Sequence, residues 1–208
     1  MKRIDHSNLK AQPEKENFRG KYESKNFISR HLVNNYYKNV KSLLELIPEV
    51  NNAHEIGIGE GYSTKRLRDW IPSISGSEFV VELISRAKQN NPGSDIFQES
   101  VYDLQYDDSS VDLVFLLEVL EHLDYPEIAL QEIKRISKRY LIIGVPNEPL
   151  WRILNFCRLK YVSDFGNTPG HLNHWSKGKF IELINKHYGK VIAVKSPIPW
   201  TIILAEKY

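Results

Sequence analysis

Residues 54–61 read HEIGIGEG, and this glycine-rich stretch is the most informative part of the sequence about the fold. Gly57, Gly59 and Gly61 stand where an apolar run gives way to a helical stretch. Glycine has no Cβ, so its backbone can bend tightly and approach a ligand closely. A dinucleotide fingerprint G-x-G-x-x-G would need glycine at position 62, where the chain has Tyr62, and no Lys-Ser or Lys-Thr pair completes a phosphate loop here. The stretch therefore predicts a loop for a nucleotide cofactor of another kind.

The chain has the composition of an ordinary globular domain. Its 208 residues are 41% hydrophobic and 26% charged, which suits one well-packed domain. A net charge of +2 with a pI of about 8.5 is too balanced for the concentrated basic face of a nucleic-acid-binding protein, so nucleic acid is not the favoured partner. The single Cys157 allows no intramolecular disulfide, and the first residues lack the apolar core of a signal peptide, so we expect none. No apolar run reaches the roughly 18 residues of a transmembrane segment. We expect a cytoplasmic protein.

Short apolar runs alternate with helical stretches along most of the chain. Residues 1–20 are charged and poor in apolar residues, which predicts a flexible arm before a single domain of residues 21–208. Apolar spacing over residues 24–47 predicts an N-terminal helical extension that ends before Pro48. Strands are predicted at residues 53–59, 79–83, 95–99, 111–119, 140–145, 191–194 and 201–205. The alternation predicts an α/β three-layer sandwich with a mostly parallel sheet. The last two strands are too close in sequence for a helical crossover, so we expect them to be antiparallel.

Two acids follow predicted strands. Glu82 is placed at the carboxyl end of the strand predicted at residues 79–83, where a carboxylate can accept hydrogen bonds from both hydroxyls of a ribose. Asp103 follows the next strand and can accept a hydrogen bond from an adenine amino group while Tyr102 covers the ring. The alternative for this pair is a core tyrosine beside an aspartate that caps a turn.

The strongest family marker is the stretch at residues 112–123, DLVFLLEVLEHL, which Pro126 follows. Together with an acid before G-x-G-x-G, and with the two acids above, it resembles the class I S-adenosylmethionine (SAM) methyltransferases typified by quinone-biosynthesis enzymes. The resemblance implies a Rossmann-like fold with a seven-stranded sheet, SAM as the cofactor and S-adenosylhomocysteine (SAH) as its product. It assigns the methionine half of SAM to Glu55, Gly57, Gly59, Gly61 and the backbone carbonyl of Leu117, the ribose to Glu82 beside Leu83, and the adenine to Tyr102 and Asp103.

Methyl transfer needs few side chains, because the protein mainly aligns an activated methyl group with the acceptor. A base helps when the acceptor is a hydroxyl, and His122, His171 and His174 are the catalytic candidates. We expect a site without a metal. The alternative is a divalent ion held by Glu118, Glu121 and His122, which would lie near one another on a helical turn. Quinone-pathway O-methyltransferases and small-RNA 2′-O-methyltransferases show a similar E-x-x-E-H group, but relatives without a metal share these letters, and a structural histidine is a third interpretation.

The segment at about residues 147–176 is longer and more aromatic than a simple connection, and we expect it to cover the acceptor side as an insertion. Its basic residues stand among aromatic ones and could alternatively rest on a membrane surface. The whole predicts a SAM-dependent methyltransferase with a small-molecule acceptor, leaving O, N and C open as the acceptor atom. The alternatives are a metal-assisted RNA 2′-O-methyltransferase and a non-catalytic SAM-binding protein. The sequence does not predict the oligomeric state.

Overall fold

The computed structural model describes residues 9–11 and 26–208 of the chain. The predicted flexible arm of residues 1–20 lies outside the described residues except at positions 9–11. There, Leu9 packs against one of the hydrophobic cores, and the backbone amides of Lys10 and Ala11 donate to the two carboxylate oxygens of Asp124 at 2.8 and 3.0 Å.

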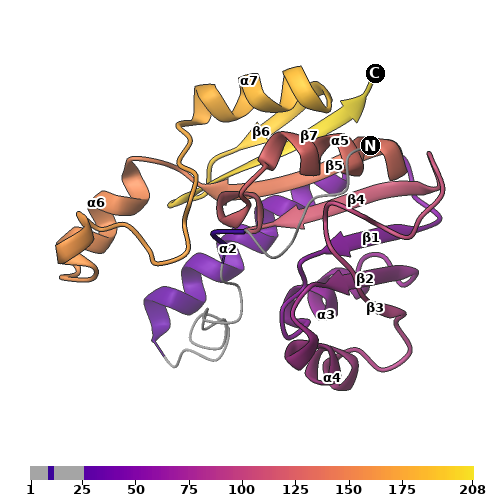
Figure 1. Cartoon of the computed structure of the whole chain (residues 1–208), viewed down its shortest axis with the longest axis horizontal. Coiled ribbons are helices and arrows are strands. Elements are labelled where there is room, and N and C mark those ends of the chain that lie inside the picture. The colour runs from indigo at the N-terminus through magenta and orange to yellow at the C-terminus, as the bar shows by residue number, and fades with distance from the viewer. Residues whose placement is uncertain (1–8, 12–25) are drawn as a thin grey trace.

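Seven strands of the described residues form one sheet (Figure 1). In chain order they are β1 (Ala53–Ile56), β2 (Ile74–Glu78), β3 (Ile96–Gln98), β4 (Val111–Leu117), β5 (Ser137–Pro146), β6 (Gly189–Lys195) and β7 (Trp200–Lys207). Their order in the sheet is β3-β2-β1-β4-β5-β7-β6. The first five strands are parallel, whereas β7 is antiparallel to both β5 and β6. The expected seven-stranded, mostly parallel sheet with an antiparallel last strand is confirmed.

The helices lie on both faces of this sheet, as expected for a three-layer sandwich. They are α2 (Phe27–Leu44), α3 (Tyr62–Arg68), α4 (Val81–Asn90), α5 (Pro126–Ile136), α6 (Leu150–Cys157) and α7 (Lys177–His187), with short 3₁₀ helices η3 (Leu120–His122) and η4 (Val162–Asp164). The predicted N-terminal extension is a single helix in the described part of the chain. It begins at Asn26, whose side chain accepts from the backbone N–H of Ile28. Within residues 9–11 and 26–208, no helix is long and apolar enough to cross a bilayer.

Strand β4 separates the two hydrophobic cores. Successive side chains of a strand point to opposite faces. Leu113 and Phe115 accordingly pack in the core formed with α2 and α3, while Val114 and Leu116 pack in the core formed with α5 and α7. The central strand is thus buried on both faces, which explains why its sequence is a nearly continuous apolar run rather than an alternating one.

The strand predicted at residues 79–83 is wrong. The second strand is β2, Ile74–Glu78, and the apolar run after it opens helix α4 instead. The residues of β2 read ISGSE, so Ile74 is its one large apolar side chain and no apolar run marks it as a buried strand. Small side chains are needed here, because a Cβ on Gly76 would lie 2.9 Å from Ile58 and because Ser75 and Ser77 hydrogen-bond the buried ring of His54.

Candidate active site

The glycine loop follows β1 and adopts a backbone that favours glycine. Gly57, Gly59 and Gly61 have φ values of 72°, 56° and 80°, in the left-handed region that L side chains rarely adopt. A Cβ on Gly57 would lie 2.5 Å from the side chain of Val119, the residue before η3. The loop therefore packs directly against the segment after β4, and Gly61 begins helix α3.

An acid at the end of β2 holds this loop in place. One carboxylate oxygen of the buried Glu78 accepts from the backbone N–H of Gly59 at 2.7 Å, and the other accepts from Val80 at 2.9 Å. Glu82, predicted at the strand's end, is instead exposed in the first turn of α4, and Leu83 follows it there. Glu78 takes the predicted position. It was missed because β2 was assigned too far along the chain.

Glu55 lies in β1 and is fully buried. Its carboxylate accepts from the hydroxyl of Thr64 in α3 at 2.6 Å, and burial raises its pKa to about 7. The carboxyl group thus joins β1 to the first turns of the helix after the glycine loop. Its predicted pairing with the methionine ammonium stays a prediction.

The residues predicted for the adenine follow β3. Tyr102 is buried and its hydroxyl accepts from the backbone N–H of Tyr125 at 3.2 Å, while Asp103 is exposed in a turn closed by its N–H and the carbonyl of Ser100. Leu117 is the half-buried last residue of β4. Because β1 to β4 are parallel, the glycine loop, Glu78, the Tyr102 turn and Leu117 all lie along the edge where these strands end.

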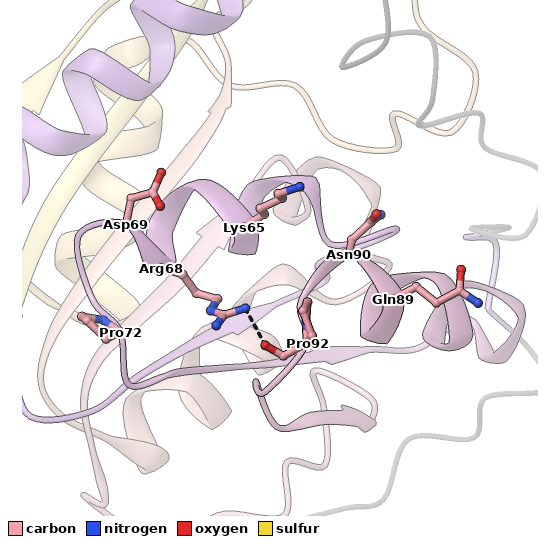
Figure 2. A pocket seen from close by; sticks show the side chains of 7 residues that line it. All are labelled: Lys65, Arg68, Asp69, Pro72, Gln89, Asn90 and Pro92. Carbon is pink, nitrogen blue, oxygen red and sulfur yellow. Dashed lines mark hydrogen bonds between the residues drawn. The ribbon is translucent and has the colours of Figure 1, made fainter.

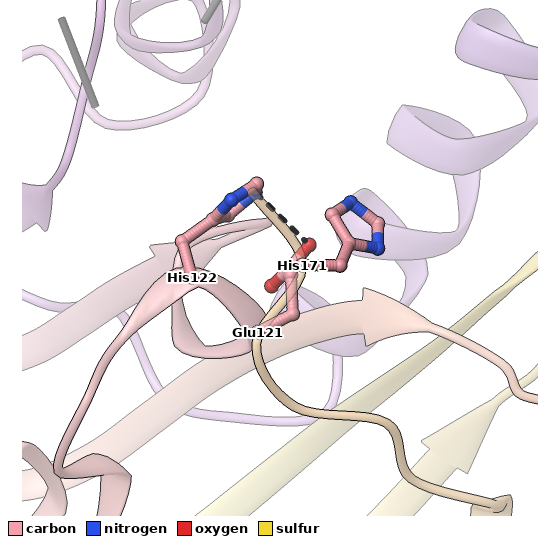
Figure 3. A group of neighbouring side chains, drawn as sticks. All are labelled: Glu121, His122 and His171. Carbon is pink, nitrogen blue, oxygen red and sulfur yellow. Dashed lines mark ion pairs between the residues drawn. The ribbon is translucent and has the colours of Figure 1, made fainter. Parts of the chain in front are cut away.

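Two histidines and an acid meet beside this edge (Figure 3). Glu121 and His122 come from η3, whereas His171 comes from the loop before α7. One carboxylate oxygen of Glu121 and one ring nitrogen from each histidine all lie within 4.8 Å of one another. Glu121 and His171 are buried, and the two imidazole rings contact edge to face with centroids 4.9 Å apart. Nδ1 of His122 is 3.2 Å from the carbonyl oxygen of Gly170. A carbonyl can only accept, so Nδ1 carries a proton, and Nε2 of His122 lies 3.9 Å from a carboxylate oxygen of Glu121, as the dashed line in Figure 3 marks.

The other members of the predicted groups are not part of this cluster, although the ring centroid of His174 lies 6.5 Å from that of His171. His174 is exposed, its Nε2 lies 2.6 Å from the amide oxygen of Asn167, and burial with the nearby Arg152 lowers its pKa. The predicted metal set of Glu118, Glu121 and His122 is corrected, because the cluster contains His171 in place of Glu118. Glu118 has a left-handed backbone with φ of 59° and precedes η3, so the assumed helical turn does not form.

The predicted insertion contains α6 and η4 and is tied to η3. The backbone amides of Leu172 and Asn173 both donate to the carbonyl of Glu121 at 2.9 Å. Trp151 of α6 stacks on His171 with ring centroids 5.9 Å apart and donates its indole N–H to Thr168. These contacts place the insertion beside the histidine cluster.

A cavity of about 460 Å³ lies elsewhere, between α3 and α4 (Figure 2). It is lined by Lys65, Arg68, Asp69, Pro72, Gln89, Asn90 and Pro92. Arg68 donates to the carbonyl oxygen of Pro92 at 3.0 Å. Both helices begin at the cofactor edge, and most of the lining residues come from their carboxyl-terminal ends, so this cavity is separate from the candidate site.

Comparisons with known proteins agree with this fold. Residues 54–142 match the family model of a methyltransferase domain, and none of the curated protein sequences matches the chain. A SAM-dependent methyltransferase from Thermotoga maritima is 21% identical with a TM-score of 0.65, over 83% of this chain and 89% of its own. Magnesium protoporphyrin IX methyltransferase from Synechocystis, solved with bound SAH, is 15% identical with a TM-score of 0.64, over 88% of each chain. A chain from the complex of the Haloferax volcanii Trm112 methyltransferase activator with a methyltransferase is 18% identical with a TM-score of 0.66, over 86% of this chain and 92% of its own. At these identities the likeness to solved structures shows a shared fold.

Proposed function

We propose that this chain, which is a class I SAM-dependent methyltransferase, methylates a small-molecule acceptor bound beside η3 and the loop before α7. The observation that carries the proposal is the contact of the glycine loop with Val119, three residues before His122. This contact makes the cofactor loop and the histidine cluster neighbours. An acceptor held by the cluster would therefore lie next to the methionine end of SAM.

The contacts with SAM follow from the positions of the loop residues. Gly57, Gly59 and Gly61 leave room for the methionine half, and Tyr102 with Asp103 would hold the adenine. We assign the ribose hydroxyls to Glu78 in place of Glu82. Each oxygen of the Glu78 carboxylate already accepts one backbone N–H. A carboxylate oxygen can accept more than one hydrogen bond, so these two bonds are compatible with further ones from a ribose diol.

SAM supplies a methyl group that its sulfonium already activates. The protein then needs to orient the acceptor and, when the acceptor is a hydroxyl, to remove its proton. His122 is suited to this task because the Gly170 carbonyl holds its Nδ1–H, so a neutral His122 would take up the acceptor's proton at Nε2, and the Glu121 carboxylate 3.9 Å away would stabilise the resulting imidazolium. The ring of His171 contacts both His122 and Trp151, and it would help to position the acceptor beside His122.

Metal-assisted methyl transfer is the second candidate, and the cluster of Glu121, His122 and His171 favours it. Two imidazoles and one carboxylate suit a divalent first-row transition ion. A metal-ligating histidine usually donates its second ring N–H to a carbonyl or carboxylate, as His122 does to Gly170. These three residues would hold the ion, which would polarise an acceptor hydroxyl. RNA as the acceptor is less favoured, because the near-neutral chain lacks the charge expected of an RNA-binding surface.

The test is SAH release by the purified full chain. A small-molecule fraction of a metabolite extract and an RNA fraction are supplied separately, each with and without a chelator. Release that depends on the small-molecule fraction and ignores the chelator supports the first candidate. Release that a chelator abolishes and added manganese restores supports the second. If SAM binds and no fraction yields SAH, the non-catalytic alternative is favoured, and failure to bind SAM refutes all three.

A further inference from the structure

The insertion carries a concentration of exposed apolar side chains. On α6, Ile153 and Phe156 are 54% and 48% exposed, and after the helix Leu159 and Phe165 are 83% and 76% exposed. We call this set, together with the exposed Tyr161 and Val162, the apolar face. Figure 1 shows α6 and the orange segment after it at one end of the molecule, beyond the sheet. Single exposed apolar residues are ordinary, but a group of six within thirteen residues indicates an interaction surface.

Helix α6 has a polar residue at its most buried position, where an ordinary surface helix would have an apolar one. Asn155 is buried, and its amide donates to the carbonyl of Gly166 and to the hydroxyl of Thr168. The backbone N–H of Gly166 donates to the carbonyl of Tyr161 at 2.8 Å, and that of Lys160 donates to the carbonyl of Asn155 at 2.9 Å. These hydrogen bonds thus hold the inner side of the segment together, while the side chains of the apolar face lie on the outside.

The backbone is strained where these side chains are displayed. Five non-glycine residues in the described part of the chain have positive φ, and three of them are Leu159, Tyr161 and Phe165, with values of 54°, 52° and 50°. Bulky L residues adopt this conformation at a cost, and such strain collects at functional sites. Glycine would adopt it freely. The segment therefore retains bulky apolar residues against a conformational penalty, and the side chains of Leu159 and Phe165 are mostly exposed there.

The charged residues near the apolar face indicate which kind of partner it binds. Arg158 and Lys160 are exposed between the apolar residues, Arg152 lies on the same helix, and the only acid in residues 150–166 is Asp164. Two copies of the chain facing each other here would bring like charges together. An anionic lipid surface instead accepts both components, since its headgroups attract the cations and its acyl boundary accepts the apolar side chains.

We propose that the apolar face, with Arg158 and Lys160, docks the protein onto an anionic membrane surface. The protein would rest on the bilayer without spanning it, which agrees with the absence of a spanning helix among the described residues. This inference goes beyond the methyltransferase reaction and does not depend on which acceptor is used.

The test is co-sedimentation of the full chain with vesicles of phosphatidylcholine alone or with about one third phosphatidylglycerol. We expect sedimentation with the anionic vesicles and weakening by salt. Replacing both Arg158 and Lys160 by alanine should lower the partition coefficient about thirty-fold, the effect of two cations near an anionic surface. Leu159→Ser with Phe165→Ser should reduce binding to the background. The matched control is Lys190→Ala with Ile192→Ser on β6, which changes an exposed cation and an exposed apolar residue elsewhere and should bind as the wild type does.

A further double variant, Leu159→Gly with Phe165→Gly, tests whether these side chains serve membrane binding or folding. It removes both side chains and relieves the backbone strain, so it should keep or raise the unfolding midpoint while it loses vesicle binding. A large drop in the midpoint would mean that these side chains support the fold, and would overturn the proposal. It is also overturned if the wild type stays in the supernatant with anionic vesicles, or if the serine variant binds undiminished. A dimer in light scattering that the serine variant abolishes, without vesicle binding, would assign the face to self-association instead.

Discussion

Substituting Glu78 and Glu82 separately gives the sharpest test of the cofactor site. Glu78→Ala removes a buried carboxylate that accepts from Gly59 and that we assign to the ribose, whereas Glu82→Ala removes an exposed acid in the first turn of α4. A hydrogen bond to a charged group contributes about 1.5–3 kcal/mol. The Glu78 variant should therefore bind SAH about 10- to 150-fold more weakly. The Glu82 variant should stay within about 0.5 kcal/mol of the wild type, as is usual for surface substitutions.

Calorimetric titration with SAH measures both affinities, and a deoxy ligand separates the two roles of Glu78. Loss of Gly59 support would weaken SAH and its 2′-deoxyribose analogue equally. Loss of a ribose contact would weaken SAH strongly and the analogue less, since the two changes remove the same interaction. The assignment is refuted if Glu82→Ala weakens binding and Glu78→Ala does not. It is also refuted if the Glu78 variant loses equal affinity for both ligands.

The remaining predictions concern the glycine loop, the buried acid and base of β1, and the histidines. Gly57→Ala places a Cβ against the segment after β4 at a left-handed φ, so SAM binding should be lost; unchanged affinity in calorimetry would contradict this. Burial lowers the pKa of His54 to about 3, so its contribution to stability is complete above pH 6.5 and is lost as the pH falls toward 3; up to about 5 kcal/mol should disappear in denaturant titrations across that window. Glu55 has a pKa raised to about 7, so its contribution to stability changes in the opposite direction: it is complete below pH 4.5 and is lost as the pH rises to about 7, and Glu55→Gln should flatten the fall in stability over that window. His171→Ala should spare SAM affinity and lower turnover, by up to about 10²–10⁴-fold if the ring takes part in base catalysis. His174→Ala should lower turnover less, because that ring is exposed beside Asn167. If all histidine variants turn over as fast as the wild type, catalysis depends on positioning alone.

The sequence predicted the elements whose local pattern reflects their burial. The run at residues 111–117 is buried on both faces and reads as a strand, and the spacing of apolar residues in α2 shows which side meets the sheet. Strand β2 is mostly buried as well, but after Ile74 its residues are serine, glycine and Glu78, so no hydrophobic run marks it. That error moved the acid expected at the strand's carboxyl end from Glu78 to Glu82.

The candidate acceptor site required contacts that sequence spacing does not contain. Glu121 and His122 are adjacent in the chain and were readily grouped. His171 joins them because the loop before α7 is bonded to the carbonyl of Glu121, which is a tertiary contact across 50 residues. Glu118 has the right spacing in the sequence but is not part of the cluster, because its backbone is left-handed. Glutamate rarely adopts this conformation, so the sequence gives no reason to expect it.

The packing of Val119 against Gly57 makes the two halves of the site energetically dependent on each other. When SAM occupies the loop, any shift at Gly57 must be followed by Val119 and hence by η3, which holds His122. Linkage requires that a change in acceptor affinity caused by SAM be matched by an equal change in SAM affinity caused by the acceptor. We expect such cooperativity to be positive, so that SAM and the acceptor should each bind more tightly when the other is present.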